Sequence, residues 1–182
     1  MEELRVLNNG GIILYPTDTV WGLGCDATQP LAIRKIIELK GRSDTKNLIL
    51  LVRDIFMLRN YVESIPQAAL EILEKEENPI TIIYPNAKNL PIKLLSQDNS
   101  IGIRIPKHQY LIDLITKLGR PLVSTSANIS GHPSPNSFAD IDQRIISNVD
   151  YISSKEHDTS KSNKESKIVL IKDDGSVVRV RG

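Results

Sequence analysis

The sequence has little of three features that define whole classes of protein: cysteine, long apolar runs and charge of one sign. Cys25 is the single cysteine, so no disulfide can form within the chain, as is typical of a reducing compartment. The longest apolar runs, such as 48–52 and 168–171, have the length of a strand and are far too short to span a bilayer. Residues 1–10 lack the pattern of a secretory signal. We therefore expect a soluble, cytoplasmic protein with no membrane contact.

Charge and aromatic content give no sign of a general nucleic-acid binder. The 23 basic and 22 acidic residues leave a net charge of +1, and aromatic residues make up 4% of the chain. A binder of that class normally shows a strong basic excess with interleaved aromatic residues. His108, His132 and His157 lie too far apart in the sequence to predict a metal site. A lone cysteine is more often a small buried apolar residue than a nucleophile.

The order of the expected elements predicts a single α/β domain over residues 1–182. Segments with apolar residues at helical spacing alternate with short apolar runs, and a hairpin pattern closes the chain, which indicates a mixed sheet with flanking helices. Thr28 is the expected cap of the second helix, and the glycine-rich residues 16–27 are expected to form a loop. We expect helices at 1–9, 28–40, 64–73, 108–118 and 139–146, and strands at 12–15, 48–52, 80–84, 101–105, 122–123, 149–152, 168–172 and 177–180.

Residues 153–167 form a polar tract that contains no large apolar side chain. Such a segment buries too little surface to offset the entropy that is lost when it becomes ordered. We expect a mobile loop that becomes ordered when ligands bind.

Three short polar stretches are candidates for chemistry. Residues 15–24, Tyr-Pro-Thr-Asp-Thr-Val-Trp-Gly-Leu-Gly, follow an expected strand and offer threonine hydroxyls beside glycines that allow a ligand to approach the backbone. Residues 40–43, Lys-Gly-Arg-Ser, place two cations close enough to clamp phosphate groups. Residues 124–128, Ser-Thr-Ser-Ala-Asn, gather groups that hydrogen-bond phosphate or carboxylate oxygens. The ordinary interpretations are a turn, a basic helix end and a capping cluster, respectively.

Taken in this order, the three stretches resemble the motifs of the YrdC/Sua5 threonylcarbamoyl-AMP synthases, in the short form that consists of the YrdC domain alone. The resemblance covers about residues 10–181 and depends most on Lys-Gly-Arg at 40–42 and Ser-Ala-Asn at 126–128. It implies an open, twisted α/β fold with a large concave surface. It also implies that L-threonine, bicarbonate and ATP, the last with Mg²⁺, give threonylcarbamoyl-AMP and pyrophosphate. A separate transferase complex would use the product for the t6A modification at position 37 of tRNA.

The resemblance also implies roles for individual residues. The threonine side would be formed by Thr17, Arg104, Ser124 and Ser166, with Arg104 holding the carboxylate. The ATP side would be formed by Lys40, Arg42, Ser100, Ser126, Asn128, Ser134 and Arg179. The expected catalytic residues are Lys40, Arg42, Ser126 and Asn128. Fixed cations and donors of this kind stabilise the charge that develops on the leaving pyrophosphate. No protein side chain is expected to hold a metal ion.

Two stretches depart from the family pattern. Lys46-Asn47-Leu48 stands where many relatives have a proline, and Leu51 stands where some have a histidine. Near the end of the chain, Glu-Ser-Lys at 165–167 replaces Pro-Ser-Thr. The alternative function is a module that binds double-stranded RNA or tRNA, which the concave surface of the family also suggests. A carbamoyl-transfer accessory domain is a further alternative.

Overall fold

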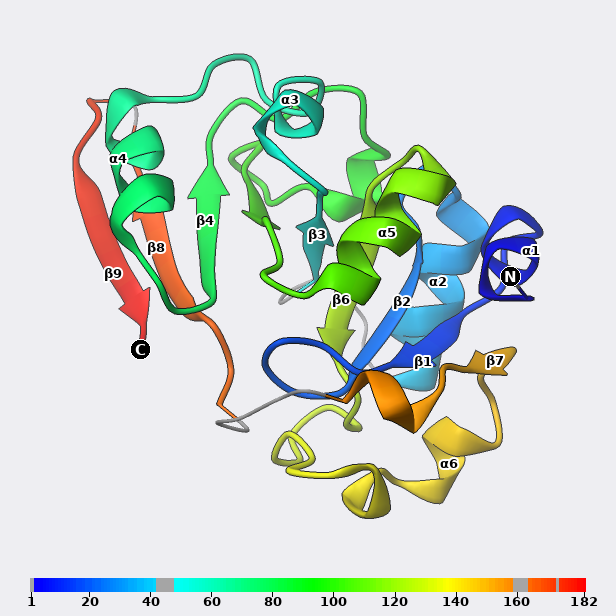
Figure 1. Cartoon of the computed structure of the whole chain (residues 1–182). Coiled ribbons are helices and arrows are strands. Elements are labelled where there is room, and N and C mark those ends of the chain that lie inside the picture. The colour runs from blue at the N-terminus through cyan, green and yellow to red at the C-terminus, as the bar shows by residue number, and fades with distance from the viewer. Residues whose placement is uncertain (1, 42–47, 159–163, 173) are drawn as a thin grey trace.

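Nine strands form one twisted mixed sheet in the computed structural model, which describes residues 2–41, 48–158, 164–172 and 174–182. The strands lie in the order β7-β1-β2-β6-β3-β5-β4-β8-β9 (Figure 1). The pairs β1–β7, β3–β5 and β4–β8 are parallel, and the other neighbours are antiparallel. The strands are β1 Ile13–Tyr15, β2 Gly22–Asp26, β3 Ile49–Leu51, β4 Ile80–Tyr84, β5 Ile101–Arg104, β6 Leu122–Ser126, β7 Tyr151–Ile152, β8 Lys167–Ile171 and β9 Val177–Arg181. The predicted α/β class with a mixed sheet is confirmed.

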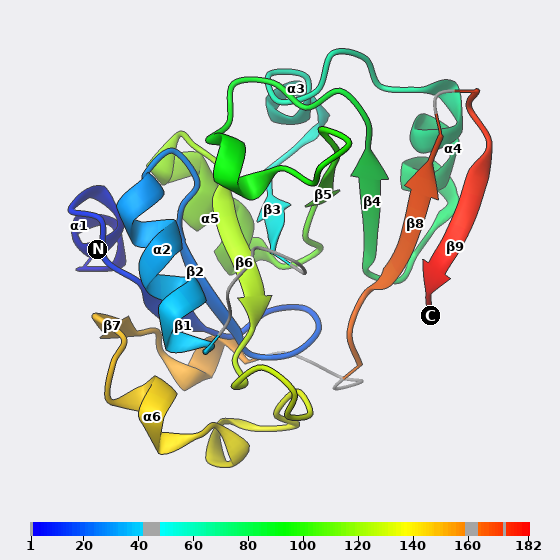
Figure 2. The same ribbon diagram turned by 180° about the vertical axis from the view of Figure 1, so that it is seen from behind.

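Helices flank the sheet on both faces. Helices α4 and α5 lie over one face and α2 lies over the other, while the two termini lie toward opposite ends of the sheet (Figures 1 and 2). The α-helices are α1 Glu2–Asn8, α2 Pro30–Leu39, α3 Ile55–Leu58, α4 Gln67–Lys75, α5 Gln109–Leu118 and α6 Gln143–Ile146. Short 3₁₀ helices are η1 Ile92–Leu94, η2 Phe138–Asp140 and η3 Lys155–His157.

In helix α5, the spacing of the apolar residues and one glycine determine which face is buried and where the helix ends. Its buried residues Leu111, Leu114, Ile115 and Leu118 recur at the helical spacing and form one apolar stripe toward the core. Gly119 ends the helix with a φ of 70°, a left-handed conformation that glycine adopts without steric cost. The predicted helix at 108–118 is therefore confirmed to within a residue.

Strand β2 corrects the prediction of a loop at 16–27. Gly22 and Gly24 discourage a strand assignment, because glycine is depleted in strands. Position 24 nevertheless needs a glycine, because other atoms approach the backbone of β2 closely at this point. A Cβ placed on Gly24 would lie 2.5 Å from the carbonyl oxygen of Val123 and 2.7 Å from the ring of Tyr15.

Two further details differ from the prediction. Thr28 does not cap α2, because its hydroxyl donates to the carboxylate of Asp26 at 2.8 Å and the capping position is Gln29. Helix α3 was not predicted from the sequence. It is a single turn started by Asp54, whose side chain accepts a hydrogen bond from the backbone N–H of Met57 at 2.7 Å.

A small second core fixes the two loops that carry the polar motifs. It contains Leu14, Trp21 and Leu23 from the first motif region and Ala127, Ile141 and Ile145 from the segment after β6. The ring of Trp21 meets that of Phe138 edge-on, with 5.0 Å between the centroids. The stretches at 15–24 and 124–128 are therefore held against each other by packing.

The polar tract at 153–167 is partly hydrogen-bonded to this body. Helix η3 lies within it, and Trp21 Nε1 donates to the carboxylate of Asp158 at 2.8 Å. Residues 159–163 lie outside the described residues. The mobility of the tract stays a prediction.

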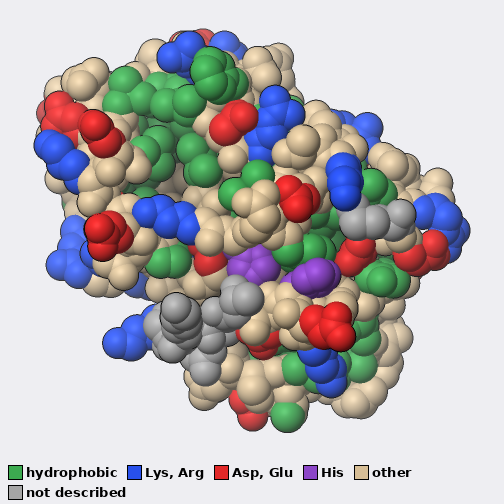
Figure 3. Space-filling model, in the orientation of Figure 1, with side chains coloured by type: hydrophobic (Ala, Val, Ile, Leu, Met, Phe, Trp, Pro, Cys, Tyr) green, Lys and Arg blue, Asp and Glu red, His purple; other side chains and the backbone are tan. Residues whose placement is uncertain are grey.

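The surface does not show a field of one sign on the face drawn in Figure 3, where Lys and Arg side chains are interspersed with Asp and Glu. Hydrophobic side chains gather in a hollow at the upper left of the same view. Among the described residues, no helix is both long enough and apolar enough to cross a membrane.

Candidate active site

A pocket of about 350 Å³ lies where the chain leaves β1 and β6, beside the end of β5 and the start of β8. It brings together residues from the polar stretches at 15–24 and 124–128 and from the end of the polar tract at 153–167. Of the predicted site residues, the lining includes Thr17, Arg104, Ser124, Ser126, Asn128, Ser134 and Ser166. Arg42 lies outside the described residues, and the placement of the others is given below.

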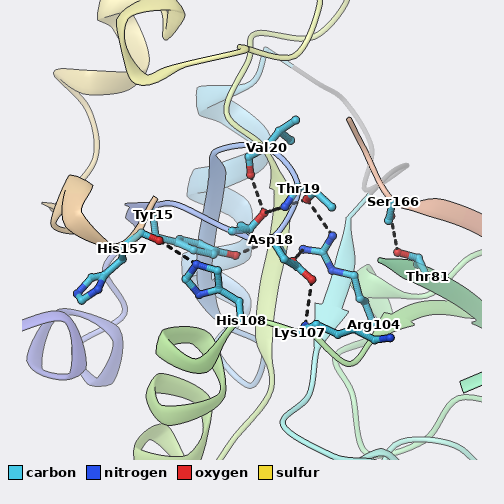
Figure 4. Close-up of polar contacts among 12 residues, drawn as sticks. Tyr15, Asp18, Thr19, Val20, Thr81, Arg104, Lys107, His108, His157 and Ser166 are labelled. Atoms are coloured by element: carbon cyan, nitrogen blue, oxygen red, sulfur yellow. Dashed lines mark hydrogen bonds and ion pairs between the residues drawn. The ribbon is translucent and has the colours of Figure 1, made fainter. Parts of the chain in front are cut away.

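Arg104 is the central cation of this pocket, and it is almost completely buried at 3% exposure. Its Nη1 donates to Thr19 Oγ1 at 3.0 Å, and its Nη2 lies 3.3 Å from Asp18 Oδ1 (Figure 4). Asp18 is itself anchored, because its second oxygen accepts a hydrogen bond from the backbone N–H of Lys107 at 3.0 Å. Arg104 Nε has no hydrogen-bond partner in the described part of the chain. The guanidinium is thus held rigidly in the lining of the pocket, where its positive charge suits an anionic ligand group.

Thr17 lines the pocket, but its hydroxyl is already fully used by its own loop. Arg104 donates to Thr19 Oγ1, so the Thr19 hydrogen points to Thr17 Oγ1 at 2.9 Å. Thr17 Oγ1 also accepts from the Thr19 backbone N–H at 2.9 Å and donates to the Val20 carbonyl at 2.8 Å. One donor and two acceptor positions are all that a hydroxyl offers. In this structure Thr17 therefore shapes the loop that holds Arg104.

Ser124 is prepared to donate a hydrogen bond into the pocket. The hydroxyl of the fully buried Tyr15 donates to Ser124 Oγ at 2.7 Å, so the Ser124 hydrogen remains for another acceptor. Burial raises the pKa of Tyr15 well above its usual range, which keeps this donor protonated. The glycines of β2 make room for the ring, because a Cβ on Gly24 would collide with it.

Lys40 does not line the pocket; it lies behind the 126–128 loop with a fully buried side chain. Its ammonium group contacts the carbonyl oxygen of Ser126, that of Asn128 at 2.7 Å, and Asn128 Oδ1 at 3.3 Å. Ser126 in turn donates to Asn128 Oδ1. Lys40 and the Ser-x-Asn motif therefore meet in one cluster, in which Lys40 fixes the shape of the loop and adds positive charge behind it.

Ser166 faces the pocket from the other side, where its hydroxyl lies 2.8 Å from that of Thr81 on β4 (Figure 4). Thr81 also lines the pocket and is buried. Sequence reasoning missed it, although a lone polar residue in the apolar strand Ile-Thr-Ile-Ile-Tyr was an available signal. Thr19 was expected only to offer a hydroxyl group within the first motif, and Asp18 was quoted there without a role.

Two predicted ATP-side residues lie elsewhere. The hydroxyl of Ser100 donates to Asp98 at 2.7 Å, and Ser100 does not line the pocket. Arg179 lines a separate groove beside α4, whereas Arg181 lines the main pocket. A bulge explains the exchange: Ile168 pairs with Arg181 while Val169 pairs with Arg179, so β9 has one extra residue there. Side chains alternate between the faces of a strand, and the extra residue places the two arginines on opposite faces.

Glu165 connects the two sides of the pocket mouth. Its carboxylate accepts a hydrogen bond from Ser134 at 2.5 Å and forms an ion pair with Arg181. The guanidinium of Arg181 also donates to the Ser166 carbonyl from Nε at 3.3 Å and from Nη2 at 3.1 Å. Neither Glu165 nor Arg181 was predicted as a site residue.

The donor set of the pocket does not form a cage for a resident metal. Among the described residues, no three His, Cys, Asp or Glu side chains come together in a way that holds an ion. Glu165 is the only acidic side chain of the described lining, and it is paired with Arg181.

Fold and site together define an α/β domain with a polar pocket that is suited to anions. Comparison with known proteins gives the family: the Sua5/YciO/YrdC family model, described as "Telomere recombination", matches residues 5–181. The chain is 33% identical over 150 residues to the threonylcarbamoyl-AMP synthase of Xanthomonas euvesicatoria pv. vesicatoria, a match covering 81% of this chain and 80% of that protein. The chain therefore belongs to the Sua5/YciO/YrdC family, as the resemblance predicted.

Solved structures agree with this assignment. E. coli YciO superposes with a TM-score of 0.85 at 27% identity, covering 99% of this chain and 86% of that chain. Sua5 of P. abyssi, solved in complex with L-threonine, superposes with a TM-score of 0.83 at 26% identity, covering 93% of this chain. This chain spans 49% of that Sua5 chain.

Proposed function

We propose that this protein is a threonylcarbamoyl-AMP synthase that joins L-threonine, bicarbonate and ATP. The observation that supports this most is the state of Arg104, a buried guanidinium that is fixed by Asp18 and Thr19 and lines a polar pocket. Relatives named threonylcarbamoyl-AMP synthase, which match about four-fifths of the chain, support the same reaction.

Threonine would bind at the Arg104 end of the pocket. The guanidinium would donate charge-assisted hydrogen bonds to the carboxylate of the amino acid, and such a bond is about twice as strong as a neutral one. Ser124 would donate from one side of the pocket and Ser166 would contact the ligand from the other. These positions hold the amino group where it is carboxylated by bicarbonate.

ATP would bind at the end formed by the 126–128 loop, Ser134 and Arg181. The new carbamate oxygen attacks the α-phosphorus, a P–O bond forms, the bond to the β-phosphate oxygen breaks and pyrophosphate leaves. Lys40 would act from behind the loop, and Arg181 from the mouth, to stabilise the charge that moves onto the leaving group. Mg²⁺ carried by ATP would neutralise part of the same charge. We place this reaction in the cytoplasm, ahead of a transferase complex that modifies tRNA.

The test is release of pyrophosphate with all three substrates and with threonine or bicarbonate left out in turn. The proposal expects release only when all three are present. Release that continues at the same rate without threonine would contradict it, because ATP hydrolysis alone would then account for the signal.

A further inference from the structure

We propose that Glu165 is an internal competitor for the anion-binding groups of the pocket, so that its carboxylate must leave Ser134 and Arg181 before a phosphate group can bind there. Glu165 then sets how tightly the pocket holds anions. This inference rests on the proposed function, in which those two residues face the nucleotide.

The first support is the geometry of the carboxylate. One oxygen accepts the hydrogen bond from Ser134 at 2.5 Å, and the other pairs with Nη1 of Arg181. The three residues belong to three separate segments: the loop after β6, the residues ahead of β8, and the end of β9. A carboxylate that links a hydroxyl donor to a guanidinium occupies the kind of site that a phosphate oxygen fits, because the two anions share the same donors.

The second support is the way in which Arg181 is held. Its Nε and Nη2 both donate to the carbonyl oxygen of Ser166, which leaves Nη1 directed at Glu165. The guanidinium is therefore positioned by the backbone of the pocket and does not depend on Glu165 for its placement. Removing the carboxylate should free Nη1 without moving the group.

The third support is exposure. The side chains of Glu165 and Arg181 are 35% and 44% exposed, so water weakens their attraction. Partly exposed pairs of this type shift an equilibrium by a factor of about five at most. A carboxylate held so weakly gives way to a ligand that carries several negative charges, and it repels such a ligand while it remains.

The experiment measures binding of pyrophosphate without metal by titration calorimetry at low ionic strength. The proteins are the wild type, Glu165→Gln, Arg181→Gln and the double variant. Glu74→Gln is the matched control, because it removes the same charge from an exposed position outside the pocket. We expect Glu165→Gln to bind pyrophosphate about 2- to 5-fold more tightly. Glu74→Gln should leave the affinity unchanged.

The double variant shows whether Glu165 lowers affinity by occupying Arg181 or only by placing a negative charge near the ligand. If Glu165 acts by occupying Arg181, Glu165→Gln brings no gain once Arg181 is already Gln. Equal affinity of Glu165→Gln and the wild type, or no binding by either, would overturn the inference. An equal gain in the Arg181→Gln background would also overturn it.

The calorimetry is repeated with Mg²⁺ to test whether Glu165 instead helps the pocket to bind a metal-loaded ligand. If Glu165→Gln weakened binding of Mg²⁺-pyrophosphate, the carboxylate would be supporting the metal and the inference would fail. The threonine-dependent release of pyrophosphate is measured on the same variants. If Glu165→Gln binds pyrophosphate more tightly but no variant releases pyrophosphate in a threonine-dependent way, the inference stands and the proposed function is contradicted. If threonine-dependent release is seen but Glu165→Gln binds no more tightly, the proposed function stands and the inference is contradicted.

Discussion

At the scale of single residues, most polar groups of the site are already hydrogen-bonded to each other. Thr17 uses its hydroxyl for the loop, Tyr15 donates to Ser124 Oγ, and Lys40 binds carbonyl oxygens of the 126–128 loop. The sequence motifs predicted some of the residues that meet at the pocket, but they missed Thr81, Glu165 and Arg181. They did not predict the contacts of Tyr15 and Lys40, because their hydrogen-bond partners lie far away in the sequence and leave no local pattern.

Lys40→Ala should lower both activity and stability. Loss of a charge-stabilising group costs about 10²- to 10³-fold in the rate of pyrophosphate release. The buried carbonyl oxygens of Ser126 and Asn128 would also lose their donor, which costs about 1–3 kcal/mol in the free energy of unfolding. Urea unfolding and the release assay measure the two effects, with the exposed Lys75→Ala as the control. If Lys40→Ala releases pyrophosphate at the wild-type rate and unfolds at the wild-type urea midpoint, Lys40 has neither role.

The amino-acid preference should follow the order threonine, serine, valine. Ser124, Ser166 and Arg104 line the pocket, and in the proposed function the two serines offer hydroxyl groups to the ligand while Arg104 holds its carboxylate. A site that hydrogen-bonds a hydroxyl rejects an analogue without one by up to about 10⁴–10⁵, whereas loss of one methyl group costs about 10- to 200-fold. Adenylate formation with each amino acid at saturating ATP and bicarbonate gives the order. Valine reacting as well as serine would show that the hydroxyl is not recognised.

At the scale of elements, regular segments such as the amphipathic helix α5 and the apolar strand β4 could be predicted from the sequence, and irregular ones could not. Strand β2 was missed because its glycines are required by contacts with Tyr15 and Val123 that only the sheet creates. Arg181 was missed because the family resemblance assigned Arg179, and the bulge in β9 that places the two arginines on opposite faces could not be seen in the sequence. Both features depend on neighbouring strands.

Gly24→Ala should therefore destabilise the fold. The new Cβ would lie 2.5 Å from the carbonyl oxygen of Val123, a backbone atom that cannot move without disturbing β6. Overpacking of this kind costs about 1–3 kcal/mol in the free energy of unfolding. Gly102→Ala is the control, because its Cβ would meet side chains of Ile49 and Thr81 at 3.2 and 3.3 Å. An unfolding midpoint for Gly24→Ala at or above that of Gly102→Ala would contradict the close approach seen here.

At the scale of the whole molecule, the alternation of helices and strands predicted the α/β class, while the strand order arises from long-range pairing. That order brings β1, β6, β5 and β8 to one pocket although they are far apart in the sequence. The two arginines that line the pocket, among the described residues, are each paired with a carboxylate, and Figure 3 shows mixed charges. This charge balance favours a small-molecule site over an RNA-binding surface.

Duplex RNA should therefore bind weakly. Non-specific electrostatic binding typically gives dissociation constants of about 10⁻⁴–10⁻⁶ M at physiological salt, and we expect a value at the weak end of that range. Titration of a short RNA duplex over a series of salt concentrations measures both the affinity and the number of phosphate contacts. Tight binding that falls steeply with salt would favour the RNA-binding alternative.

The central claim is that Arg104 holds threonine while its carbamate is joined to AMP. The most direct measurement is mass spectrometry of the product formed from ¹³C-bicarbonate, threonine and ATP by the wild type and by Arg104→Gln. The account predicts a threonylcarbamoyl-AMP that carries one ¹³C atom with the wild type, and a rate about 10²- to 10³-fold lower with the variant. Absence of the labelled product with the wild type, or its formation at an equal rate by Arg104→Gln, would contradict the account.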